Sequence, residues 1–134
     1  LGAASAITLR RDLDELVELI DERGLADDPL IRQRVAELEI AVEALRLGAL
    51  RALTTQMKVG VPGPEGSLAK WEWALANQGL TELAADVLGP EALDPDSPWS
   101  YRLLRSRANS IEGGTTDVMK NIVAERVLGL PRLR

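Results

Sequence analysis

The sequence predicts an all-α, antiparallel four-helix bundle, and three observations support this fold class. Apolar residues recur at spacings of three and four through most of the 134 residues, and no segment alternates with the period of two that strands require. Glycines and prolines at 24, 62–64, 89–90 and 113–114 divide these periodic stretches. Hydrophobic residues make up 46% of the chain, enough for the buried core of one domain of this length.

A cap and a proline separate the first two predicted helices. Apolar positions from Leu9 to Ile20 define the first helix, which Gly24 ends. Asp28 is a typical N-cap and Pro29 a typical first helical residue, so the second helix is predicted over 29–59, with a length of roughly 45 Å. Its expected buried stripe consists of Leu30, Val35, Leu38, Val42, Leu45, Ala49 and Leu53. A helix this long needs partners along its whole length.

The sequence of the second half of the chain predicts three further helices. After the breaker at 61–65, a third helix is expected from Pro64 to about Leu88, and a turn-rich stretch follows it at 91–98. A shorter helix is predicted from about 99 to 109. The Gly113-Gly114 pair then interrupts the chain, and a final helix over 115–128 is expected to be capped by Thr115 or Thr116.

Residue types that are absent exclude several kinds of chemistry. The chain has no cysteine and no histidine, which excludes disulfides, thiol nucleophiles, Ser-His-Asp triads and metal sites built from Cys or His. A net charge of -5 argues against nucleic acid as a partner. No apolar run is long enough to span a membrane, and we expect a cytoplasmic protein. The basic last third faces either solvent or an anionic partner.

Two neighbouring features in the last third could carry chemistry. Two glycines before the helix start at Thr115, Thr116 and Asp117 expose backbone N–H groups, which is an arrangement that binds anions but also an ordinary tight turn. Glu112 precedes the glycines and is either a general base or a solvated loop carboxylate.

Arginines and tryptophans offer weaker signals. Arg102, Arg105 and Arg107 fall on different sides of a helix, so surface pairing with the acidic first helix is favoured over a clamp for an anion. Trp71 and Trp73 point about 200° apart, so one is expected in the core and the other at an edge or interface.

Two segments carry a resemblance to a known family: SIEGGTTDVMKNIVAERVLGLPR at 110–132 and ERGLADDPLIRQRV at 22–35. The first is similar to the C-terminal signature of acyl-CoA dehydrogenases, in their actinobacterial type. The second is similar to the junction of the first two helices of that family's C-terminal domain. With Leu88-Gly89 at the end of the third helix, the resemblance covers residues 1–134. It implies that the family's N-terminal helical and middle β domains are absent from this chain.

The resemblance implies an FAD-dependent oxidoreductase that acts on a CH–CH bond. Such an enzyme dehydrogenates an acyl-CoA thioester at its α and β carbons in fatty acid or steroid catabolism, with electron-transfer flavoprotein as partner. The family assembles as oligomers largely through this bundle. For this chain the resemblance implies a domain that contributes oligomerisation surface and part of the flavin site, retains no FAD and is inactive by itself.

The resemblance assigns flavin contacts residue by residue. Arg23 matches the arginine that reaches the pyrophosphate of a neighbouring subunit's flavin, although 24–27 lack the family's Lys-Thr-Phe-Gly. Gly89 matches the first glycine of a Gly-Gly turn, and Pro90 replaces the second. The residues that match the helix start at the flavin's adenosine half are Thr115, Thr116 and Asp117.

The position of the catalytic base is left open. Relatives with a base in this loop carry glutamate two residues before the threonine, where this chain has Gly113, and Glu112 is offset by one residue. Other relatives keep the glutamate on an earlier helix. The chain is alternatively a non-catalytic assembly subunit of a hetero-oligomeric acyl-CoA dehydrogenase, and an acyl-CoA oxidase on the same fold is a third reading.

Overall fold

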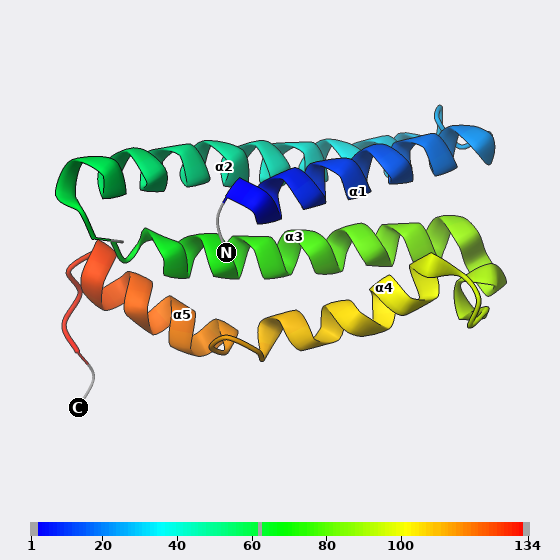
Figure 1. Ribbon diagram of the computed structural model, residues 1–134. Coiled ribbons are helices and arrows are strands. Elements are labelled where there is room, and N and C mark those ends of the chain that lie inside the picture. Colours follow the sequence, from blue (N-terminus) through cyan, green and yellow to red (C-terminus); the bar gives the residue numbers. More distant parts are fainter. Residues whose placement is uncertain (1–2, 62, 133–134) are drawn as a thin grey trace.

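The computed structural model describes residues 3–61 and 63–132 and consists of helices and connecting turns in that part of the chain. Figure 1 shows α1 and α2 side by side, α3 beneath them, and α4 and α5 following one another along the opposite side of α3. The α-helices are α1 (Ala3–Glu22), α2 (Pro29–Val59), α3 (Glu65–Leu88), α4 (Pro98–Ser106) and α5 (Thr116–Ile122). Shorter helical segments are η1 (Gly89–Leu93), η2 (Arg107–Ser110) and η3 (Val123–Val127). The predicted all-α bundle is confirmed, with its fourth position shared by α4 and α5.

Local capping explains the bounds of α2, which are those predicted. Asp28 Oδ1 accepts hydrogen bonds from the backbone N–H groups of Leu30 and Ile31 at 2.8 and 3.1 Å. At the other end Gly60 adopts a φ of 82° and donates its N–H to the Gln56 carbonyl at 2.8 Å. Such a positive φ suits glycine and ends the helix. Pro62 of the predicted breaker lies outside the described residues.

The core lies among α1, α2 and α3. Leu9, Leu13, Leu16 and Ile20 repeat at spacings of three and four along α1 and are almost completely buried. They pack with the following buried residues of the other two helices: Leu38, Val42, Leu45, Leu80, Leu83, Ala84 and Val87. Packing of these apolar side chains holds α1 on α2 and α3, although the rest of the α1 surface is charged.

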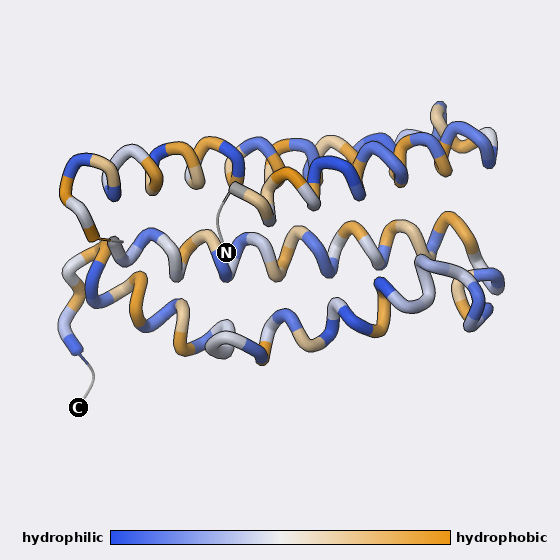
Figure 2. Tube along the Cα trace, viewed as in Figure 1, coloured by the Kyte–Doolittle hydropathy of each residue, from blue (hydrophilic) through white to orange (hydrophobic). Residues whose placement is uncertain are grey.

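The predicted buried stripe of α2 is wrong at both ends. Leu30 is 76% exposed and Leu53 is 49% exposed, whereas Leu38, Val42 and Leu45 are buried as predicted. Leu53 is exposed because α1 has 20 residues against 31 in α2 and therefore leaves the last turns of α2 uncovered (Figure 1). Leu30 lies in the first turn of α2, directly after the Asp28 cap, and is not part of the core. Apolar residues continue along this uncovered end, as Figure 2 shows by colour. They are Leu47, Leu50, Leu53, Met57 and Val59, all exposed.

The C-terminal helices are less regular than predicted. The helix predicted over 99–109 is α4 followed by the 3₁₀ segment η2, and the one predicted over 115–128 is α5 followed by the π-helical segment η3. Part of the stretch expected to be irregular forms the 3₁₀ turn η1. Among the described helices, none is long and apolar enough to cross a membrane.

Candidate functional site

The structure divides the predicted flavin contacts into two groups. Arg23 follows α1 and lies near the end of α3, because its Nη1 donates a hydrogen bond of 3.0 Å to Glu91, two residues after Gly89. Thr115 caps α5, which packs against α3, and Lys70 in the first half of α3 contacts the adjacent Gly114. Lys70 and Gly89 are separated by 19 positions, which corresponds to about 28 Å of helix. The two groups therefore lie far apart on this chain.

Arg23 and Gly89 are both open to a partner. The guanidinium of Arg23 is about a third exposed, and its hydrogen bonds lower the pKa of the Glu91 carboxyl group, which is itself exposed. Gly89 has a φ of 61°, and a Cβ built there would meet no atom within 4 Å. Because the ion pair is solvated, an anionic ligand can compete with Glu91 for Arg23.

Thr115, and not Thr116, is the N-cap of α5. Its backbone is extended, with φ -63° and ψ 157°, and its Oγ1 accepts a hydrogen bond of 3.3 Å from the N–H of Val118. Thr116 is half-buried in the first turn, and Asp117 beside it is exposed. An acidic residue in the first turn is favoured by the helix dipole.

The glycine pair is required by the backbone before this cap. Gly113 and Gly114 have φ values of 64° and 109°, which residues with a side chain rarely adopt. A Cβ on Gly114 would also collide with the terminal methyl group of Met119. The predicted break at this position is confirmed, and its cause is both conformational and steric.

Glu112 is held by two donors. Its Oε2 accepts a hydrogen bond of 2.9 Å from Arg105 Nη2, and its Oε1 accepts one of 3.0 Å from Asn109 Nδ2. The hydrogen bond from Arg105, with a smaller contribution from Asn109, lowers the pKa of the Glu112 carboxyl group. A carboxylate with a lowered pKa is a weaker proton acceptor. The geometry therefore suits an anchored loop carboxylate better than a base.

Lys70 and Asn109 hold this loop, and the sequence reasoning missed both. The Nζ of Lys70 donates to the carbonyl oxygens of Asn109 at 2.7 Å and Gly114 at 2.6 Å. Asn109 also accepts at its side-chain oxygen a hydrogen bond of 2.8 Å from Asn77. The signal available in the sequence was the spacing of seven between Lys70 and Asn77, which places two polar residues on one face of α3.

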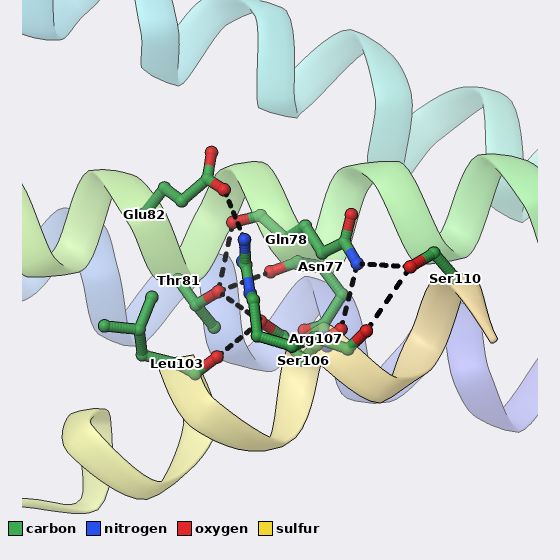
Figure 3. Close-up of polar contacts among 8 residues, drawn as sticks. All are labelled: Asn77, Gln78, Thr81, Glu82, Leu103, Ser106, Arg107 and Ser110. Atoms are coloured by element: carbon green, nitrogen blue, oxygen red, sulfur yellow. Dashed lines mark hydrogen bonds and ion pairs between the residues drawn. The ribbon is translucent and has the colours of Figure 1, made fainter. Parts of the chain in front are cut away.

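The same face of α3 continues as a polar contact with α4 and η2 (Figure 3). Gln78 donates a hydrogen bond of 3.0 Å to the carbonyl of Ser106, and the hydroxyl groups of Thr81 and Ser106 lie 3.0 Å apart. Arg107 adds an exposed ion pair of 2.6 Å with Glu82. These contacts fix the register of α4 and η2 on α3, since each buried polar group needs its own partner.

The three arginines have different partners. Arg102 pairs with Glu15 of α1 at 2.6 Å, which confirms the predicted contact with the acidic first helix. For Arg105 and Arg107 that prediction is wrong, because they pair with Glu112 and Glu82. Glu112 and Glu82 are closer to these two arginines in sequence than the residues of α1 are.

The two tryptophans, both half-buried, contact different parts of the fold. Trp73 packs against the hydrophobic core, as predicted for one of them. Trp71 lies at the contact with α5, where the ammonium of Lys120 is 5.4 Å from its ring centre. The pair therefore joins α3 to the core on one side and to α5 on the other.

Comparison with known proteins identifies the family. Residues 1–128 match the family model described as "Acyl-CoA dehydrogenase, C-terminal domain". The chain belongs to this family. It is 41% identical over 130 residues to acyl-CoA dehydrogenase IpdE1 of Mycobacterium tuberculosis, covering 94% of this chain and 33% of that protein. IpdE1 of Mycolicibacterium smegmatis is 40% identical, with 94% and 32% covered.

Solved structures of other acyl-CoA dehydrogenases share this fold. A variant of the Tcur3481–Tcur3483 steroid ACAD superposes with a TM-score of 0.81 at 21% identity, covering 98% of this chain and 37% of that one. The ChsE4–ChsE5 complex of Mycobacterium tuberculosis gives 0.73 at 21% identity, covering 100% and 37%. The chain thus spans about a third of the length of the IpdE1 proteins and of these structures.

Proposed function

We propose that this domain belongs to an FAD-dependent acyl-CoA dehydrogenase and supplies it with part of the flavin site and an oligomerisation surface. The complete enzyme dehydrogenates an acyl-CoA thioester at its α and β carbons and passes electrons to electron-transfer flavoprotein. The observation that carries the proposal is the start of α5, where Thr115 caps a helix behind a loop fixed by buried Lys70. Such a start presents hydroxyl and N–H groups in one defined direction.

The residues present fit part of an FAD molecule. Thr115, Thr116 and Asp117 offer hydroxyl and carboxylate groups suited to the adenosine half, and Arg23 offers a guanidinium suited to the pyrophosphate. Pro90 has no N–H group, and no hydroxyl or aromatic side chain stands at 24–27. Bound FAD would accept the hydride of the reaction. Because these donors are incomplete, we expect the isolated chain to retain no FAD and to be inactive.

The separation of the two groups supports a site shared between subunits. Arg23 and Thr115 lie at positions about 28 Å apart along α3, so they suit different parts of an extended cofactor or two different cofactors. The uncovered apolar end of α2 supports association of this domain with another chain. We infer a homo- or hetero-oligomer in the cytoplasm, acting in fatty acid or steroid catabolism.

A non-catalytic assembly subunit is the second candidate function. Two observations favour it: Glu112 is engaged by Arg105 and Asn109, and its pKa is lowered. Two structures with the same fold are named as the Tcur3481–Tcur3483 steroid ACAD and the ChsE4–ChsE5 complex. In this candidate function the chain completes a partner's flavin site without a base of its own.

Counting flavin separates the two candidates. The complete protein is purified alone and after co-expression with a neighbouring dehydrogenase, and FAD absorbance is divided by chain concentration. One FAD per chain in a homo-oligomer supports the enzyme, and one FAD per two unlike chains supports the assembly subunit. A colourless protein in both preparations overturns both candidates. Acyl-CoA turnover by the isolated 134-residue chain would contradict its expected inactivity.

A further inference from the structure

Lys70 is an unusual buried charge. Its side chain projects from α3, the residue is 4% exposed, and the two partners that the structure gives its ammonium are both backbone carbonyls. Buried lysines normally pair with a carboxylate, because removal of an ammonium from water is costly. Two charge-assisted hydrogen bonds of 2.7 and 2.6 Å compensate for part of that cost. The placement therefore calls for a reason beyond core packing.

The two carbonyls lie on either side of the loop that carries Glu112. Asn109 lies next to the last residue of the 3₁₀ segment η2, and Gly114 immediately precedes the cap of α5. One ammonium thus holds both ends of the six-residue segment 109–114 against α3. The Asn109 carbonyl lies near the C-terminal end of η2, and such carbonyls are natural acceptors for a cation.

The loop needs such a constraint. Gly113 and Gly114 have the greatest backbone freedom of any residue type, and ordering them is correspondingly unfavourable. Asn109, which is 3% exposed, connects the constraint to the loop's carboxylate, since its amide donates to Glu112 and accepts from Asn77. Displacement of Asn109 or Gly114 would therefore redirect both Glu112 and the first turn of α5.

We propose that Lys70 is a positioning residue: its ammonium fixes the loop from Asn109 to Gly114 and thereby sets the direction of the start of α5 toward the flavin. The proposal rests on the proposed function for its flavin readout, but its structural part stands on the contacts alone. Lys70 acts through the loop, and it touches no reacting atom.

Hydrogen–deuterium exchange of the 134-residue chain tests the structural part. In Lys70→Met, the hydrogen-bonded amides within 111–119, those of Ile111, Glu112, Val118 and Met119, should exchange at least about tenfold faster, because local opening no longer breaks two strong hydrogen bonds. Amides of α1 should stay within about twofold. Lys58→Met is the matched control, since Lys58 is an exposed lysine near the end of α2, and should change neither region. Equal acceleration in α1 and the loop, or none in the loop, overturns the proposal.

A second variant covers the case in which Lys70→Met fails to fold. Lys70→Arg keeps a charged donor at the same place and should restore protection of 111–119 to within about threefold of the wild type. A folded Lys70→Arg chain whose loop exchanges as fast as the free peptide overturns the proposal.

Flavin affinity separates this proposal from the proposed function. In the complete flavoprotein, Lys70→Met should weaken FAD binding by about tenfold with the helical content unchanged, and Lys70→Arg should recover most of it. A complete wild-type protein that binds no flavin refutes the proposed function and leaves the exchange result to decide the role of Lys70. Unaltered FAD affinity in a variant with a mobile loop overturns the link from the loop to the flavin.

Discussion

Arg105 donates a hydrogen bond of 2.9 Å to Glu112 across one turn and the following loop, joining α4 to the loop that precedes α5. This pair determines the protonation of the carboxylate that the sequence proposes as a base. It stabilises the charged form and so lowers the pKa of Glu112 below its ordinary value of 4.5. A candidate base in this loop is therefore charged at neutral pH but weakly basic.

Replacement of Arg105 by Met should raise the pKa of Glu112 toward its ordinary value. The carboxyl carbon shift of Glu112, followed by NMR from pH 2 to 7, measures this directly. Because the folded-state pKa is the lowered one, the pair stabilises the fold above the ordinary pKa and loses this effect as pH falls through the folded-state pKa. The stability difference between variant and wild type should accordingly shrink on acidification.

Arg102→Met is the matched control for this change. Arg102 also pairs with a carboxylate, Glu15, but does not contact Glu112. It should leave the titration of Glu112 unaltered. An unchanged pKa of Glu112 in the Arg105 variant would mean that the Arg105–Glu112 contact is not maintained in solution.

Gly114→Ala should destabilise the fold by about 1–3 kcal/mol, because the alanine is forced to a φ of 109° and its methyl group meets Met119. Gly48→Ala is the control, since Gly48 lies within α2 with open space around it and should gain about 0.5–1 kcal/mol. Urea unfolding of the two variants measures both changes. A neutral Gly114→Ala would show that the loop can relax away from the described geometry.

The uncovered end of α2 should mediate self-association or binding to another chain. The double variant Leu53→Asp with Met57→Asp places two charges on this surface and should reduce association without loss of helix, because both side chains are exposed in the single chain. Ile40→Asp, equally exposed but nearer the start of α2, is the control. Sedimentation velocity compares them. A wild-type domain that is monomeric both alone and with its co-expressed partner would refute the role of this surface in association.

Local signals made most of the fold predictable. The bounds of α2 were predicted correctly because Asp28, Pro29 and Gly60 act on the residues next to them. The burial of Leu53 was predicted wrongly because it depends on how far α1 reaches along α2, which periodicity within α2 does not contain. Leu30, in the first turn of α2, is also exposed.

The site was predictable only where its causes are local. The cap at Thr115 and the break at Gly113-Gly114 follow from neighbouring residues. Lys70 is different, because its partners lie 39 and 44 residues away and are backbone carbonyls that carry no sequence signature. Only the polar spacing along α3 hinted at such a contact.

The flavin content of an Arg23 variant measures whether this domain contributes to the flavin site. In the complete protein, with its partner if it has one, Arg23→Gln should lose bound FAD or weaken its binding by at least about tenfold, because a charge-assisted contact to the pyrophosphate is removed. Arg34→Gln is the control: Arg34 is likewise partly exposed and paired with one carboxylate, Asp86, at 2.5 Å. Full flavin is expected in Arg34→Gln and depleted flavin in Arg23→Gln. Equal, unreduced flavin in both would contradict the claim that this domain contributes to the flavin site through Arg23.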